Sequence, residues 1–171
     1  LIKITRPSGA FYNFTYDAAH RLTDIQDALG GKIHYTLDAM GNRIQEDIKD
    51  AQGHIVKTHS RAYDTLNRLY QDIGAYNQTI QYAYDANGNR TQITDAEGHS
   101  TQRQYDTLDR LIRSTDALNG QTDYDYDTLD RLVQVTDANN HGTIYSYNGL
   151  GDLTQLDSPN TGVTQYAYDS A

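Results

Sequence analysis

Short segments of the chain place aromatic or β-branched residues at every second position. In the first of them, Tyr12, Phe14 and Tyr16 are each separated by one polar residue. The same spacing occurs in four later trios: Ile80, Tyr82 and Tyr84; Thr122, Tyr124 and Tyr126; Thr143, Tyr145 and Tyr147; Thr164, Tyr166 and Tyr168. A period of two places each trio on one face of a β-strand. The pattern therefore predicts an all-β chain.

The tyrosine that ends each trio recurs at a fixed interval. The interval is 21 residues between the members of one unbroken series: Tyr63, Tyr84, Tyr105, Tyr126, Tyr147 and Tyr168. With Tyr16 and Leu37 in the same position, residues 1–171 form a single array of repeats. The full repeats are 16–36, 37–62, 63–83, 84–104, 105–125, 126–146 and 147–167, between partial repeats at 1–15 and 168–171.

Each repeat contains two turn signals, about ten residues apart. The first follows the tyrosine, and its fifth position holds residue types that tolerate a left-handed backbone: His20, Gly41, Asn67, Gly88, Asp109, Asp130 and Gly151. We expect positive φ there, as in a type I turn followed by a bulge. The second signal has the residue preference of a type I turn, as in "DALG" at 27–30, "DAQG" at 50–53 and "DAEG" at 95–98, with "RPSG" at 6–9 and "SPNTG" at 158–162 in the same register. Two strands and two turns fit 21 residues, so each repeat is predicted to be a β-hairpin.

The repeat at 37–62 is longer than the others. Its second turn, at 50–53, arrives two residues late, and Tyr63 follows a further three residues late. Both arms are therefore lengthened around one preserved turn. This predicts a hairpin that projects beyond its neighbours.

A lone hairpin is marginally stable in water, so each is expected to pair with the next and to stack the tyrosine stripes across neighbouring strands. The repeats predict about 14 to 16 strands, and open sheets beyond about 10 strands curl, split or close. The predicted fold is one large curved antiparallel sheet of tandem 21-residue hairpins.

Composition and charge exclude several classes of protein. The chain has no cysteine, which excludes disulfides and thiolate sites. The net charge of −9, with dispersed basic residues, argues against a nucleic-acid partner. No apolar run approaches the roughly 20 residues of a membrane span. The first residues, "LIKITRPSG", include no Met and no signal-peptide pattern, so we expect the chain to be part of a longer protein.

The candidate chemical sites are weak. "DANGNR" at 85–90 imitates a calcium loop without its glycine and glutamate, and the histidines mostly lie in or beside expected turns: His20, His34, His54, His59, His99 and His141. The carboxylates of Asp123, Asp125 and Asp127 are close in sequence, but an aspartate after the tyrosine recurs in nearly every repeat and so fits a turn acceptor better than an acid or base. We predict no catalytic, cofactor-binding or metal-binding residue and no cofactor, hence no enzyme.

Two recurring residue types have a structural and a functional interpretation. The tyrosine stripe could be a sugar-binding platform, but packing material for the sheet is the favoured interpretation, with each hydroxyl reaching solvent or a backbone partner. The recurring arginines are expected to bridge to acidic turn residues as exposed pairs, marking the register more than stabilising the fold: Arg21, Arg68, Arg110 and Arg131.

The repeated sequence motifs resemble those of a known family. "YDTLDRL" at 105–111 and 126–132, "YDANGNR" at 84–90 and the "TDAxG" turn resemble the YD repeats of Rhs proteins, toxin-complex shells and teneurins. The resemblance covers essentially the whole chain. It implies a β-sheet that spirals into a hollow shell, which in the bacterial members holds a toxic C-terminal domain. The self-cleaving junction and the toxin domain of a complete Rhs shell are missing, and Pro7 and Pro159 each lie in an ordinary repeat turn.

Two functional hypotheses follow from this resemblance. The first is a non-catalytic wall segment of a shell that encloses or displays a toxin domain in a secreted polymorphic toxin system. Its partners would be neighbouring YD repeats, the C-terminal toxin domain and the bacterial secretion machinery. The second is a cell-surface adhesion module that binds a glycan or a protein. Either implies a secreted or cell-surface location.

Overall fold

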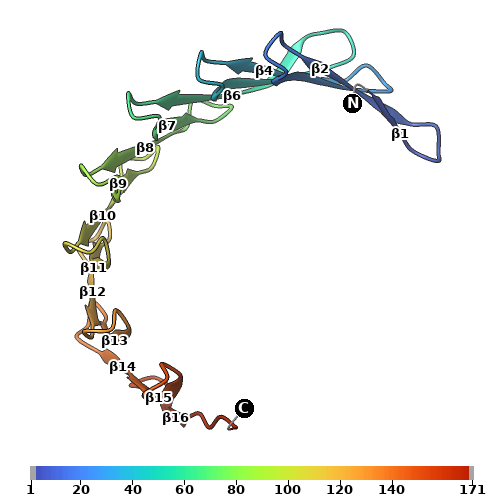
Figure 1. The fold of residues 1–171 in the computed structure, drawn as a ribbon. Helices are drawn as coiled ribbons and strands as arrows, with labels where there is room; N and C mark the ends of the chain where they lie inside the picture. Colours follow the sequence, from blue (N-terminus) through green and yellow to red (C-terminus); the bar gives the residue numbers. More distant parts are fainter. Residues whose placement is uncertain (1–2, 170–171) are drawn as a thin grey trace. The chain divides into compact units, whose positions relative to one another are not determined.

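The computed structural model describes residues 3–169, which contain sixteen β-strands and no helix (Figure 1). The strands are β1 (Lys3–Thr5), β2 (Phe11–Tyr16), β3 (Leu22–Asp27), β4 (Lys32–Leu37), β5 (Arg43–Lys49), β6 (Ile55–Tyr63), β7 (Leu69–Ile73), β8 (Thr79–Tyr84), β9 (Arg90–Thr94), β10 (Ser100–Tyr105), β11 (Leu111–Thr115), β12 (Gln121–Tyr126), β13 (Leu132–Thr136), β14 (Gly142–Tyr147), β15 (Leu153–Ser158) and β16 (Gly162–Gln165). They form one open antiparallel sheet whose strand order is the chain order. The all-β prediction and the strand number are confirmed.

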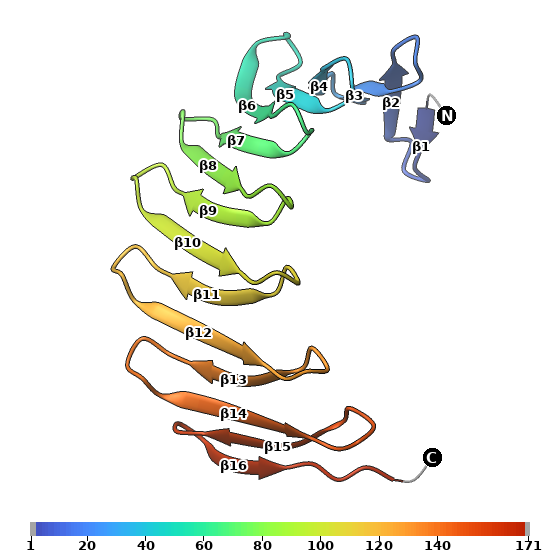
Figure 2. The same ribbon diagram turned by 60° about the vertical axis from the view of Figure 1, so that its left-hand side comes forward.

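The chain divides into two compact units. Unit 1 extends to Tyr82 and includes Asp95–Glu97, and unit 2 comprises Ala83–Thr94 and the residues from Gly98 onward. Within each unit the strands contact only their sequence neighbours. Figure 2 shows β9 to β16 lying side by side, each antiparallel to the next. Stability in each unit therefore depends on contacts between adjacent strands.

On one face of unit 2, tyrosines lie opposite aliphatic residues of the adjacent strand. One face carries the tyrosines of β12, where Tyr124 lies opposite Val135 and Tyr126 lies opposite Leu132. A return strand thus separates one tyrosine strand from the next, so aromatic residues alternate with aliphatic ones. The predicted stacking of tyrosines across adjacent strands is wrong, because the chain order places each return strand between two tyrosine strands.

Burial is shallow across the described residues. Tyr35 of β4, at 7% exposure, is the one buried apolar residue among residues 3–169, and Asp24 and Asp47 are the buried polar residues. Most strand residues are half-buried. A sheet built from hairpins covers each side chain mainly by its cross-strand neighbours, which explains why few side chains are fully enclosed.

The backbone of the first turn follows the prediction. All seven predicted positions have positive φ, from 61° at Asp109 to 95° at Gly88. The second turn adopts the same geometry, which the sequence analysis did not predict. Its fourth position also has positive φ and is filled by Gly9, Gly30, Gly53, Asn77, Gly98, Asn119 and Asn140. Both ends of the hairpins therefore use a left-handed residue to match the twist of the strands.

Gly88 provides a test of this geometry, because its φ is +95° and a Cβ built on it would meet no atom within 4 Å. Gly88→Val should lower the free energy of unfolding by about 1–2 kcal/mol, since a β-branched residue resists positive φ. Gly88→Asn should cost much less, because Asn tolerates this conformation. Chemical denaturation measures both, and equal stabilities of the two variants would contradict a left-handed residue at this position.

The long repeat forms the projecting hairpin that its length predicts. β5 has seven residues and β6 has nine, whereas β7 has five and β8 has six. β7 pairs with β6 only from Ser60 to Tyr63. The first five residues of β6, Ile55–His59, therefore extend beyond the end of β7. On the other side Lys49 still pairs with Lys32, and Ala51 of the loop between β5 and β6, coloured cyan in Figures 1 and 2, lies beside Gly30, so the hairpin projects on the β7 side alone.

Candidate functional site

The aspartate after the tyrosine closes the first turn of the repeat. In Asp127, Oδ1 accepts hydrogen bonds from the backbone N–H groups of Leu129 and Arg131, at 2.9 and 3.0 Å. Its Oδ2 accepts a bond of 2.7 Å from Nε of Arg131. These contacts, the N–H of Arg131 first and its guanidinium second, lower the pKa of Asp127 below its ordinary value of 3.8. The same three bonds occur at Asp17, Asp64 and Asp106. The predicted turn-acceptor role is confirmed.

In two of the first turns Asn takes the place of Arg, and in a third turn Asn takes the place of the aspartate that accepts the backbone bonds. Asn89 donates from Nδ2 to Oδ2 of Asp85 at 3.1 Å, and Asn42 does the same for Asp38 at 2.9 Å. In the repeat at 147–167, Asn148 accepts the backbone bonds and donates its own Nδ2 to Oδ2 of Asp152 at 2.8 Å. The geometry of the turn therefore persists when the charges change.

The calcium-like loop at 85–90 is one of these turns. Oδ1 of Asp85 accepts the N–H groups of Asn87 and Asn89 at 3.0 and 2.8 Å. Both of its carboxylate oxygens thus bond donors of the same turn. Among residues 3–169, no group of three His, Cys, Asp or Glu side chains is arranged to hold a metal ion.

The arginine of the first turn connects its repeat to the next one. The guanidinium of Arg110 lies 4.7 Å from the ring centre of Tyr126, and that of Arg131 lies 4.8 Å from the ring of Tyr147. The hydroxyl of Tyr126 donates to the carbonyl of Leu111 at 3.0 Å. Equivalent bonds run from Tyr105 to Arg90, from Tyr147 to Leu132 and from Tyr168 to Leu153. We call this unit, from aspartate through arginine to the next tyrosine, the Asp–Arg–Tyr bridge.

The bridge corrects one expectation and confirms another. The arginines were predicted to be exposed markers of register, but the Arg110 side chain is only 25% exposed and contacts two repeats. A partly desolvated cation over an aromatic face contributes more than a surface ion pair. The prediction that tyrosine hydroxyls find backbone partners is confirmed at Tyr105, Tyr126, Tyr147 and Tyr168.

Removing the Tyr126 hydroxyl tests the bridge. Tyr126→Phe should lower the free energy of unfolding by about 1 kcal/mol, because the carbonyl of Leu111 loses its hydrogen bond while the ring remains. Tyr145→Phe is the control, since no hydrogen bond of the Tyr145 hydroxyl occurs within residues 3–169. Urea denaturation of both variants measures the difference. An equal loss in both would show that the bond to Leu111 contributes nothing.

The histidines fall into two groups. His20 lies in a turn, and His54, His99 and His141 each lie beside one, as predicted. The other two lie in strands: Nδ1 of His34 in β4 is 2.8 Å from Oδ1 of Asp24, and His59 in β6 is hydrogen-bonded to Asp72. The turn interpretation does not hold for these two, because each faces a carboxylate across adjacent strands.

A row of charged groups crosses β3, β4 and β5 on one face of unit 1. Asp24 lies opposite His34, which lies opposite Asp47. Burial raises the pKa of Asp24, but hydrogen bonds from Lys32, His34 and Thr23 outweigh it, so the pKa is lowered. Burial likewise opposes the bonds from Gln45 and Thr58 that lower the pKa of Asp47. Only strand register brings the members of this row together, so the sequence pattern alone does not predict it.

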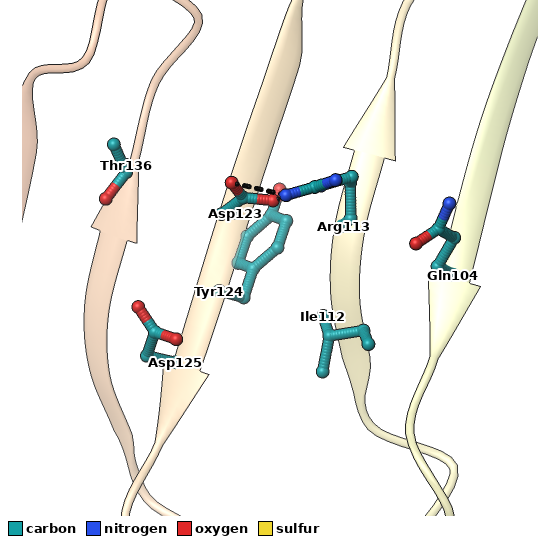
Figure 3. Close-up of a pocket in the computed structure, with 7 residues that line it drawn as sticks. All are labelled: Gln104, Ile112, Arg113, Asp123, Tyr124, Asp125 and Thr136. Carbon is teal, nitrogen blue, oxygen red and sulfur yellow. Dashed lines mark hydrogen bonds and ion pairs between the residues drawn. The ribbon is translucent and has the colours of Figure 1, made fainter.

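A shallow polar depression of about 500 Å³ lies on unit 2 (Figure 3). Arg113 and Asp123 form a two-fold ion pair in it, with Nε–Oδ1 at 2.5 Å and Nη2–Oδ2 at 3.0 Å. Asp125 and Thr136 also line it, and the Asp125 carboxylate forms no hydrogen bond within residues 3–169. The neighbouring carboxylates noted in the sequence thus have separate surroundings: Asp123 is paired with Arg113, Asp125 faces the depression and Asp127 closes a turn.

The series of antiparallel hairpins, closed by aspartate turns and joined by Asp–Arg–Tyr bridges, defines a YD-repeat sheet protein. Family comparison agrees, because the teneurin YD-shell model matches residues 31–171 and the RHS repeat model matches residues 1–32. The chain belongs to the teneurin YD-shell family. The RHS repeat match covers the remaining N-terminal part.

Solved structures of similar fold are parts of toxin complexes. The Tc holotoxin pore of Photorhabdus luminescens, with the TccC3 mutation D651A, matches with a TM-score of 0.73 and 16% identity over 91% of this chain and 9% of its own. The TcdB2-TccC3 complex matches with a TM-score of 0.62 and 12% identity over 88% of this chain and 11% of its own. The TcdB2-TccC3-Cdc42 structure matches with a TM-score of 0.61 and 12% identity over 92% and 11%. The chain thus spans about a tenth of these structures, and the likeness concerns the fold.

Curated proteins gave no match to the chain. Residues 3–169 also contain no helix that is long and apolar enough to cross a membrane.

Proposed function

We propose that the chain is a single array of YD repeats that forms a non-catalytic wall segment of a larger shell, and that this shell encloses or displays a toxin domain in a secreted polymorphic toxin system. The observation that carries the proposal is the repetition of the Asp–Arg–Tyr bridge. The Asp and Arg side chains of the repeats at 105–125 and 126–146 are bonded to their own turn, and each Arg also contacts the next tyrosine. A wall built from repeats needs such a connection between one repeat and the next.

The comparisons support the proposal at the level of fold. The chain belongs to the teneurin YD-shell family. The structures of similar fold come from toxin complexes, and this chain matches about a tenth of the length of the chains in them. The mechanism is steric: a continuous curved sheet would separate a toxin domain from protease, from water and from the producing cell. The partners are further YD repeats, the toxin domain and the secretion machinery, and the location is outside the producing cell.

Protease protection in the full-length protein tests the proposal. The domain that follows the repeats should resist digestion in the wild-type protein and become sensitive when the wall is weakened by Tyr35→Ala. Tyr76→Ala, at an 86% exposed turn position, should leave the protection unchanged. Equal digestion in all three proteins, together with particles that show no hollow interior in electron micrographs, would refute the shell.

The depression of Figure 3 favours one second candidate, a surface module that binds a glycan. Its guanidinium, carboxylate, amide and hydroxyl groups can donate to and accept from sugar hydroxyls. Screening the chain on a glycan array, with Asp125→Ala as the loss-of-binding variant, separates this candidate from the first.

A further inference from the structure

The projecting hairpin departs from the repeat and carries an incomplete strand. β5 pairs with β6 from Ile55 to Ser60, but β7 pairs with β6 only from Ser60 onward. The segment Ile55–His59 therefore has a neighbouring strand on one side. No strand within residues 3–169 pairs with its other side, which we call the open edge.

The side chains of the open edge suit strand pairing. The segment begins Ile-Val-Lys-Thr, which is rich in β-branched residues, the types favoured in strands. Ile55 and Val56 are 56% and 64% exposed, and Val56 is the extra residue of a β-bulge in the ladder between β5 and β6. Proteins commonly protect an exposed edge by making it short or by covering it, because its free N–H and C=O groups pair readily with another chain. A segment of five residues that is unpaired on one side, in the one lengthened hairpin, is therefore a feature that the regular repeat does not need.

Charge indicates the kind of strand that would fit. All four lysines of the chain lie within its first 57 residues, whereas residues 83–171 contain five Arg and fourteen Asp or Glu. Lys57 is exposed, lies in the middle of the open edge and forms no ion pair within residues 3–169. A second copy of this segment would bring Lys57 close to its own counterpart, and such like-charge contacts are unfavourable. An acidic residue in the added strand would instead neutralise Lys57.

We propose that the open edge binds an extended polypeptide segment as an additional β-strand, with β-branched residues that flank an acidic residue opposite Lys57. Backbone hydrogen bonds to Ile55–His59 supply the attachment, and Ile55 and Val56 give up exposed apolar surface. The lengthened repeat is thus a docking site for a peptide strand, a role that goes beyond that of a wall.

A short fluorescent peptide in which Val and Glu alternate is the probe. The wild-type chain should raise its anisotropy and should show slowed hydrogen–deuterium exchange at Ile55–His59 when it is bound. A peptide of the same length with Pro at every second position should not bind, because it cannot form the ladder. Equal binding of the two peptides would overturn strand addition.

Two variants locate the site on the chain. Lys57→Glu should weaken binding of the Glu peptide about tenfold or more and create binding of a Val-Lys peptide, because the charges across the pair are exchanged. Val56→Pro should abolish binding with an unchanged circular dichroism spectrum. Lys3→Glu, the same charge change on β1, should leave binding unchanged. Binding that survives both changes at the open edge, or that is lost with Lys3→Glu, would place the peptide on another strand and refute the proposal, as would self-association of the wild-type chain through Ile55–His59 in sedimentation experiments.

Discussion

Replacing Tyr35 with alanine is expected to lower the free energy of unfolding by about 3 kcal/mol, a value within the range measured when a large buried aromatic side chain is removed and a cavity remains. Tyr35 is 7% exposed, and the guanidinium of Arg43 lies 3.7 Å from the centre of its ring. The substitution removes the most enclosed apolar side chain of unit 1 and leaves Arg43 without its aromatic partner. Urea denaturation, followed by circular dichroism, measures the loss.

Tyr76→Ala is the matched control for Tyr35→Ala. The Tyr76 side chain is 86% exposed in the turn between β7 and β8, so its removal should change the stability by less than about 0.5 kcal/mol. If both variants lost the same stability, the effect would come from strand or turn propensity and not from the packing of Tyr35.

Acid is expected to unfold the chain in a narrow range below about pH 4, because many turn aspartates titrate together. The pKa values of Asp17, Asp64 and Asp127 are lowered below 3.8. The largest cause in each is the hydrogen bond from the backbone N–H of the arginine four positions later, and the side chain of the same arginine lowers the pKa further. A lowered pKa in the folded state means that the ionised form stabilises the fold. This contribution is complete above the ordinary carboxyl pKa and is lost as the pH falls through the lowered values.

Melting temperatures between pH 7 and pH 2 test this expectation. They should change little down to about pH 5 and fall steeply below about pH 4. Asp127→Asn should reduce the pH dependence, because an amide at this position can still accept the backbone bonds, as Asn148 does. A melting temperature that stayed constant down to pH 2 would mean that the turn carboxylates contribute no stability in their ionised form.

Much of the fold follows from local features of the sequence. The alternation of Thr143, Tyr145 and Tyr147 identifies a strand without any knowledge of its neighbours. The left-handed residue at Gly88 or Asp109 is equally local, because it depends on what one residue's backbone tolerates. The lengths of the arms in the repeat at 37–62 predicted the projecting hairpin, since an antiparallel pair of strands must grow on both sides of its turn.

The Asp–Arg–Tyr bridge was only half predicted. The sequence places Arg110 near Asp106 in one turn, so their ion pair could be expected. The contact of Arg110 with Tyr126 joins residues 16 positions apart in different repeats, and it depends on the order of the strands. The sequence alone therefore predicts an exposed Arg110, whereas in the structure Arg110 lies between two repeats and connects them.

By itself, the sequence determined which segments are strands, where the chain turns and which residues of the first turns take positive φ, because each of these depends on a few neighbouring residues. The tertiary structure decided which side chains meet across strands: Tyr126 with Leu132, Asp24 with His34, and the unpaired edge of Ile55–His59. These contacts depend on register, and a bulge shifts the register at the first turns, as between Asp125 and Tyr126 or between Gln104 and Tyr105. A shift of one residue moves every later side chain to the other face, so cross-strand partners emerge only when the strands are assembled.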